Sequence, residues 1–157
     1  RGDIVEAMKA HPILTGVKDI WGPSDVYRTY KEGDSLPADC TALVFGQPLI
    51  GREKGGASNP KKVPLPVVWF KDWKTSDGKT ARVVQSTMGS GKDLESPGLR
   101  RLIINAAYWS MGMETQISPT SSVDYTGHYQ PLVSGFQYEK LGVIPQIPAA
   151  YRPQAKK

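Results

Sequence analysis

The chain has 157 residues and a formal net charge of +5, and 39% of its residues are hydrophobic. These values are those of one ordinary globular domain, and they exclude a disordered or repetitive chain. No apolar run approaches the roughly 20 residues of a membrane-spanning helix, and the positive charges are scattered without a nucleic-acid-binding signature, so we expect neither a membrane nor a nucleic acid as partner.

The amino end predicts two short features. Asp3 and Glu6 form a possible capping box, which predicts a helical turn over the apolar residues between and after them. Because the chain lacks an initiator Met and opens inside this element, we expect it to be a piece of something longer. Residues 11–27 carry prolines and glycines that exclude a long helix and predict an ordered loop.

Apolar and β-branched runs predict three strands, at 41–45, 63–70 and 82–85. Pro64 and Pro66 cannot donate to a strand ladder, so we expect the start of the second strand at a sheet edge. Asp77-Gly78 is a turn signal between the second and third strands, which predicts that these two strands pair in antiparallel fashion.

Residues 81–112 carry the most informative pattern, because they indicate a buried strand, a glycine-rich turn and an amphipathic helix in succession, half of a βαβ unit. Ser96 is the expected N-cap, Pro97 fits the first helical position, and Gly112 suits a left-handed residue after the end. The apolar stripe consists of Leu99, Leu102, Ile103, Ala106 and Ser110. Three residues are left to face water: Arg100, Arg101 and Asn105. So wide a stripe suits a helix that lies on a sheet.

Beyond the helix the sequence is rich in Pro, Gly, Ser and Tyr, and no helical or long strand period is present. We therefore expect an extended tail that packs aromatic side chains onto the body and is flexible over residues 148–157. The aromatic residues are Tyr125, Tyr129, Phe136 and Tyr138.

The glycine-rich turn after the third strand is the expected location of a site, because backbone N–H groups and a helix N-terminus face outward at the carboxyl end of a strand. The segment Gly89-Ser90-Gly91-Lys92 is not a phosphate-binding P-loop, since that motif needs Gly at position 86 and Ser or Thr at position 93. We expect no cofactor there.

The other reactive side chains carry weak signals. Cys40 is the single cysteine, so an intrachain disulfide and a cysteine-built metal site are excluded. It lies next to Asp39, whose charge would raise the thiol pKa, so a structural role is expected. His11 and His128 lie in turns without a second ligand nearby, and we expect no metal site.

Five segments, in their order and spacing, resemble the ThuA-like domains linked to trehalose utilisation. They are HPILTGV from His11, Asp25-Val26-Tyr27, PVVW at 66–69, RVVQSTMG at 82–89 and PGLRRLIINAAYWSMGME at 97–114. The resemblance implies an α/β fold with an incomplete flavodoxin-like sheet, like that of class I glutamine amidotransferases, with flanking helices. It places residues 1–147 as the carboxyl-terminal part of such a domain, before the tail at 148–157.

Two positions depart from the family pattern. Asp25 stands where Glu is usual, which shortens the carboxylate arm by one methylene. Ser90 replaces a histidine at the end of the strand turn, and a hydroxyl cannot titrate near neutrality in its place. Catalysis by analogy is weakened, so whether the domain is an enzyme stays open.

The leading hypothesis is a domain that binds or processes a small neutral carbohydrate, trehalose or a related glucoside. Asp25 would accept hydrogen bonds from sugar hydroxyls and is the one candidate base, while Trp21 or Tyr27 would stack on a pyranose face. Trp69 could close the pocket or lie in the core. The floor of the pocket would consist of N–H donors from Met88, Gly89, Ser90 and Gly91.

Two alternatives use the same residues differently. In the first, the chain is a non-catalytic interaction module whose aromatic tail docks a missing N-terminal half, a neighbouring domain or a second chain. In the second, Lys92 and the helix N-terminus bind an anion, which predicts strongly salt-dependent binding. The sequence does not indicate a cellular compartment.

Overall fold

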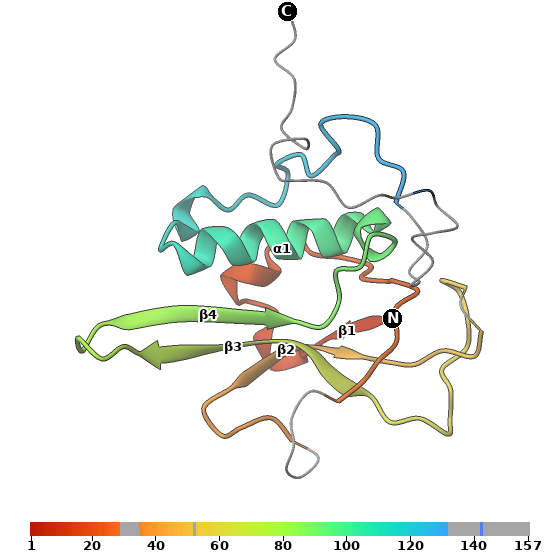
Figure 1. Ribbon diagram of the computed structural model, residues 1–157, viewed down its shortest axis with the longest axis horizontal. Coiled ribbons are helices and arrows are strands. Elements are labelled where there is room, and N and C mark those ends of the chain that lie inside the picture. Colours follow the sequence, from red (N-terminus) through yellow and green to blue (C-terminus); the bar gives the residue numbers. More distant parts are fainter. Residues whose placement is uncertain (29–34, 52, 132–141, 143–157) are drawn as a thin grey trace, which may run out of the picture.

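The computed structural model describes residues 1–28, 35–51, 53–131 and 142. Within these residues one helix lies on a four-stranded sheet (Figure 1). The strands are β1 (Gly2–Ile4), β2 (Thr41–Gly46), β3 (Leu65–Lys74) and β4 (Thr80–Ser86), and the helix is α1 (Pro97–Ser110). Short 3-10 turns lie at Glu6–Met8, Pro12–Leu14, Asp93–Glu95 and Glu114–Gln116. The sheet order is β1-β2-β3-β4, and each neighbouring pair is antiparallel.

This architecture has the mixed α/β character that the sequence predicts, but not its expected strand directions. Half of a βαβ unit would require a parallel strand partner, whereas every named strand pair in the described part of the chain is antiparallel. The helix follows a hairpin, β3 and β4, rather than one strand of a parallel layer.

The amino end forms a strand first, and the expected helical turn is limited to the 3-10 turn at Glu6–Met8, without a side-chain cap. Gly2 pairs with Gly46 and Ile4 with Val44, so the first residues extend the sheet beyond β2. Asp3 does not cap a helix, because its carboxylate accepts a 2.7 Å hydrogen bond from Arg1 Nε. The tight pairing depends on glycine, since a Cβ on Gly2 would lie 2.7 Å from the Ile20 side chain.

All three predicted strands form, as β2, β3 and β4. The Asp77-Gly78 turn is confirmed: the Gly78 N–H donates to the Thr75 carbonyl at 3.0 Å, and Gly78 has a φ of +82°. β3 lies between β2 and β4, but its start has an open edge as predicted, because Leu65 and Pro66 pair with β2 alone and the pairing with β4 begins at Val68. Pro66 lies opposite Phe45 beside an irregularity in the β2–β3 register, where a residue without an N–H group is tolerated.

The boundaries of α1 are those that the sequence predicts. The Ser96 side chain accepts a 3.3 Å hydrogen bond from the Leu99 N–H, Pro97 opens the helix, and Gly112 follows it with a φ of +72°. Asn105, expected to face water, is buried. Its Nδ2 atom donates to the carbonyls of Ile13 and Thr15, at 3.0 and 2.9 Å, so the helix is rotated to bind the amino-terminal loop. The same rotation leaves Ser110 exposed, although the sequence places it on the apolar stripe.

The core lies between α1, one face of the sheet and the loop at residues 12–20. Its buried residues are Ile13, Leu14, Val17, Ile20, Leu43, Val44, Val67, Val68, Leu99, Leu102, Ala106 and Trp109. Burial of these apolar side chains is the main stabilising contribution to the fold.

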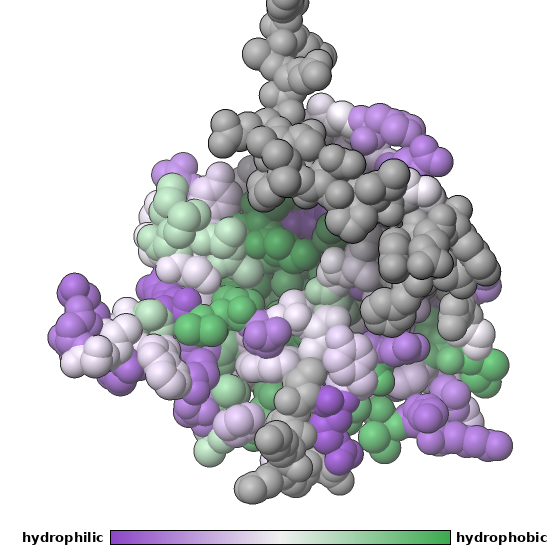
Figure 2. Space-filling view, in the orientation of Figure 1, coloured by the Kyte–Doolittle hydropathy of each residue, from purple (hydrophilic) through white to green (hydrophobic). Residues whose placement is uncertain are grey.

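Strand β4 is less buried than the sequence predicts, because it is the outer strand of the sheet. Val83 on β4 keeps 41% of its surface exposed. On α1, Ile103 and Ile104 keep 37% and 39% of theirs exposed. Hydrophobic side chains gather where α1 meets β4 in the space-filling view (Figure 2). No helix in the described part of the chain is both long and apolar enough to cross a bilayer.

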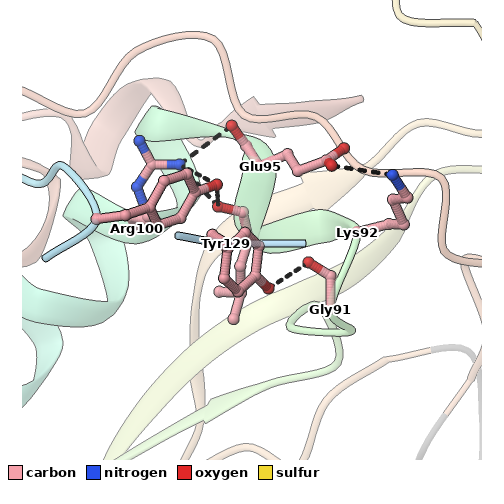
Figure 3. Close-up of polar contacts among 7 residues, drawn as sticks. Gly91, Lys92, Glu95, Arg100 and Tyr129 are labelled. Carbon is pink, nitrogen blue, oxygen red and sulfur yellow. Dashed lines mark hydrogen bonds and ion pairs between the residues drawn. The ribbon is translucent and has the colours of Figure 1, made fainter. Parts of the chain in front are cut away.

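Two of the tail's aromatic residues pack on the body as expected. The rings of Tyr125 and Tyr129 stack with centroids 4.4 Å apart, and the Arg100 guanidinium lies 4.2 Å from the Tyr125 ring. The Tyr129 hydroxyl donates to the Gly91 carbonyl at 2.6 Å (Figure 3). The other two, Phe136 and Tyr138, and the predicted flexible tail at 148–157 lie outside the described residues.

Candidate functional site

A cavity of about 650 Å³ lies at the carboxyl end of β4, between that strand's following turn and the loop at residues 23–27. It is lined by Pro23, Ser24, Asp25, Tyr27, Ser86, Thr87, Met88, Gly89, Ser90 and Lys92. Five of the seven residues proposed from the sequence therefore meet at one place. The lining combines hydroxyl groups with one carboxylate, one ammonium group and one aromatic ring.

The two walls of this cavity are joined by a buried carboxylate, that of Asp93. Its side chain is 0% exposed and accepts from the Ser24 hydroxyl at 2.6 Å and the Ser24 N–H at 3.2 Å. It also accepts from the Gly89 and Ser90 N–H groups, at 3.0 and 3.1 Å. Ser24 Oγ and Ser90 Oγ are 3.1 Å apart. The loop and the turn are thus held together by one set of hydrogen bonds.

This arrangement corrects the role expected for the glycine-rich turn. Its N–H groups form the kind of concave donor set that binds anions, but the Asp93 carboxylate already occupies it. The Met88 N–H donates to Ser86 Oγ at 3.1 Å. Met88, Gly89 and Ser90 line the cavity, but their N–H groups donate to Ser86 and Asp93 within the chain.

Asp25 and Tyr27 are the side chains best placed to meet a ligand. Asp25 is exposed at the cavity wall, and within the described residues no side chain hydrogen-bonds to its carboxylate. Tyr27 keeps 52% of its surface exposed. A carboxylate can accept from two hydroxyl groups at once, and an exposed aromatic face can cover an apolar sugar face.

The remaining candidates lie around this cavity rather than in its wall. Trp21 lines an adjoining cavity of about 190 Å³, which shares Pro23, Ser24 and Asp25 with the first. Gly91 is absent from the lining, and its carbonyl accepts from the Tyr129 hydroxyl. Trp69 borders a separate hollow with Lys71, Val83 and Gln85, so it does not close the site.

The two groups that an anion would need, the Lys92 ammonium and the N-terminus of α1, already have partners within the chain. Lys92 Nζ lies 3.0 Å from a carboxylate oxygen of Glu95 (Figure 3). The first turn of α1 is capped by Ser96, and Gly98 is buried against the Lys18 carbonyl. Since neither group faces outward unpaired, the geometry does not favour the anion-binding alternative.

Thr87 is a lining residue that sequence reasoning missed. Its hydroxyl oxygen is buried and has no hydrogen-bond partner in the described part of the structure. Leaving a buried hydroxyl unpaired costs free energy, so such a group at a cavity wall is notable. Asp93 was also missed. Its bonds to the Gly89 and Ser90 N–H groups are local to the turn, but its partner Ser24 lies 69 residues earlier in the chain.

The other titratable candidates lie away from the cavity. Burial and the neighbouring Asp39 raise the pKa of the Cys40 thiol, which agrees with its expected structural role. His11 packs between Phe70 and Trp109, with ring centroids 4.6 and 5.3 Å away. Among the described residues, no three His, Cys, Asp or Glu side chains gather as a metal site would need.

Comparison of the chain with protein-family models, curated proteins and solved structures found no match.

Proposed function

We propose that this chain is a carbohydrate-binding domain of the ThuA-like type, and that the cavity beyond β4 takes up a small neutral sugar such as trehalose or a related glucoside. The observation that supports this most directly is the meeting of Asp25, Tyr27 and four hydroxyl side chains around one cavity of about 650 Å³. That volume falls within the roughly 300–1,000 Å³ of ordinary small-molecule sites.

The chemistry of the lining suits a polyol better than an anion or an apolar ligand. The Asp25 carboxylate would accept hydrogen bonds from sugar hydroxyls, and the exposed ring of Tyr27 would cover the apolar face of a pyranose. If the domain is hydrolytic or lyase-like, Asp25 is the candidate base, and a proton-transfer partner would have to come from elsewhere.

The finer fold assignment is part of the same proposal. A flavodoxin-like sheet of the class I glutamine amidotransferase type requires parallel strands, which the four antiparallel strands described here do not supply. In that assignment, further strands would have to join the sheet at one of its edges.

Calorimetric titration with trehalose and with related neutral glucosides tests the function. We expect saturable binding that changes little between low and high salt, because the proposed contacts are hydrogen bonds and stacking. Asp25→Asn and Tyr27→Ala should each weaken binding by about tenfold or more. Asp72→Asn, an exposed carboxylate on β3 outside the cavity lining, is the matched control. Undiminished affinity in Asp25→Asn would remove that residue from the site.

The alternative function, a non-catalytic interaction module, is favoured by a different feature, the outer edge of β4. Tyr125 and Tyr129 give it no support, because their rings stack on each other and their hydroxyls bond to Leu94 and Gly91. Absence of binding for the whole sugar panel by a folded chain would favour this alternative.

A further inference from the structure

The outer edge of β4 carries backbone groups that pair with nothing in the described part of the molecule. Two hydrogen bonds set the phase of the β3–β4 ladder: Thr75 N–H to Lys79 O and Thr87 N–H to Val67 O, both 2.9 Å. Hydrogen-bonded pairs alternate in an antiparallel ladder, so the odd-numbered residues of β4 bond to β3. The N–H and C=O groups of Arg82 and Val84 therefore point away from the sheet.

A groove without charged residues runs beside this edge. It is a hollow of about 230 Å³ between β4 and α1, in the region where Figure 2 shows hydrophobic side chains together. It is lined by Val84, Ser86, Leu102, Ile103, Ala106, Ala107 and Ser110. Ile103 keeps 37% of its surface exposed there. An unpaired edge beside an apolar groove is a surface onto which another strand can add.

The sequence of β4 is complementary to itself when a second copy runs antiparallel with Val83 at the centre. In that register Arg82 faces Val84 of the second copy and Thr80 faces Ser86, so every outward-pointing residue meets another outward-pointing residue. Arg82 is the one charged residue of the strand, and Glu114 of its own chain binds it. No like charges face each other across the seam.

The placement of the helices follows from this register. A two-fold axis through Val83 and perpendicular to the sheet leaves both α1 helices on the same face, with their grooves toward each other. The exposed side of Ile103 then becomes part of a shared apolar contact. We propose that β4 pairs antiparallel with β4 of a second copy of this chain, which joins the two four-stranded sheets and closes the two grooves against each other.

Sedimentation velocity of the whole chain over a concentration series tests this proposal. We expect a dimer. Val83→Lys places two ammonium groups directly opposite each other, and Ile103→Glu puts a carboxylate in each groove. Each should raise the dimer Kd by about 100-fold or more. Ile104→Glu is the matched control, because Ile104 is 39% exposed but does not line the groove. Circular dichroism confirms that the variants fold.

A crosslinking experiment tests the register independently. In a Cys40→Ser background, Val83→Cys should form an intermolecular disulfide on mild oxidation, because directly opposite Cβ atoms lie about 4.5–5.5 Å apart. Gln85→Cys should not crosslink, since the two copies of that residue would be four positions, roughly 13 Å, apart. A monomeric wild type overturns the proposal, and the outer edge of β4 would then be available to a strand of another protein. A dimer that survives Val83→Lys and Ile103→Glu also overturns it.

Discussion

The hydroxyl of Ser24 donates a 2.6 Å hydrogen bond to the carboxylate of Asp93, across 69 residues of sequence. Ser24 lies in the loop that carries Asp25, and Asp93 follows the turn that forms the other wall of the cavity. The geometry of the candidate site therefore depends on a buried carboxylate that does not itself line the cavity.

Replacing Asp93 should destabilise the fold and loosen the site together. Asp93→Asn turns one acceptor oxygen into a donor facing N–H groups, so we expect the free energy of unfolding to fall by about 3 kcal/mol. Ser24→Ala should cost about 2 kcal/mol, since it removes one hydrogen bond to a charged group. Urea denaturation measures both.

Asp124→Asn is the control for these variants, because Asp124 is exposed and bonds to the nearby Ser122 hydroxyl. Its effect should stay within about 0.5 kcal/mol. An Asp93→Asn protein as stable as the wild type would show that the carboxylate is not needed to join the loop and the turn.

Replacing Gly98 with alanine should destabilise the fold, although alanine has the higher helix propensity. Alanine is normally better than glycine in a helix by about 1 kcal/mol, so Gly98→Ala would be expected to stabilise α1. Its Cβ, however, would lie 1.9 Å from the backbone carbonyl oxygen of Lys18. We therefore expect Gly98→Ala to lower the free energy of unfolding by about 2 kcal/mol or more. Gly55→Ala, where a Cβ would meet open space, should be nearly neutral. A gain in the melting temperature of Gly98→Ala would contradict the close approach.

The sequence predicts best the features whose causes are local. Ser96, Pro97 and Gly112 determine the ends of α1 through contacts within a few residues, and the Asp77-Gly78 turn determines the β3–β4 hairpin. Asn105 was misplaced because the carbonyls that bury it, such as that of Ile13, lie about 90 residues away. Likewise, the glycine-rich turn marks the location of the cavity, but its attachment to the loop could not be predicted, because Ser24 lies 69 residues before Asp93.

His11 should make the stability of the fold depend on pH. Burial, together with the charge of Arg82, lowers its pKa below the ordinary 6.5. Its Nδ1 atom accepts a hydrogen bond from the Ile13 N–H at 3.3 Å, which requires an unprotonated nitrogen. Between the folded-state pKa and 6.5 the unfolded chain binds more protons than the folded chain, so stability falls as the pH drops below about 6.5.

Urea denaturation between pH 7.5 and 5 measures this effect. The loss of stability should begin near pH 6.5 and level off below the folded-state pKa, where both states are protonated. His11→Asn retains a side-chain acceptor for the Ile13 N–H but does not titrate in this range, so its stability should vary less with pH. Equal slopes for the two proteins would mean that His11 is not the group responsible.

Removing the unpaired hydroxyl of Thr87 tests whether this group stabilises the fold or binds a ligand. Thr87→Val replaces a buried, unpartnered hydroxyl at the cavity wall with a methyl group of similar shape. If the hydroxyl has no partner in the free protein, the substitution should leave the free energy of unfolding unchanged or raise it by about 1 kcal/mol.

A sugar that bonds to this hydroxyl would then bind Thr87→Val about fivefold to tenfold more weakly, as titration calorimetry would show. Thr41→Val, at the exposed start of β2 and outside the cavity lining, controls for the loss of a hydroxyl elsewhere in the sheet. A marked loss of stability in Thr87→Val would mean that the hydroxyl is already bonded within the folded chain, and unchanged sugar affinity would mean that the ligand does not reach it.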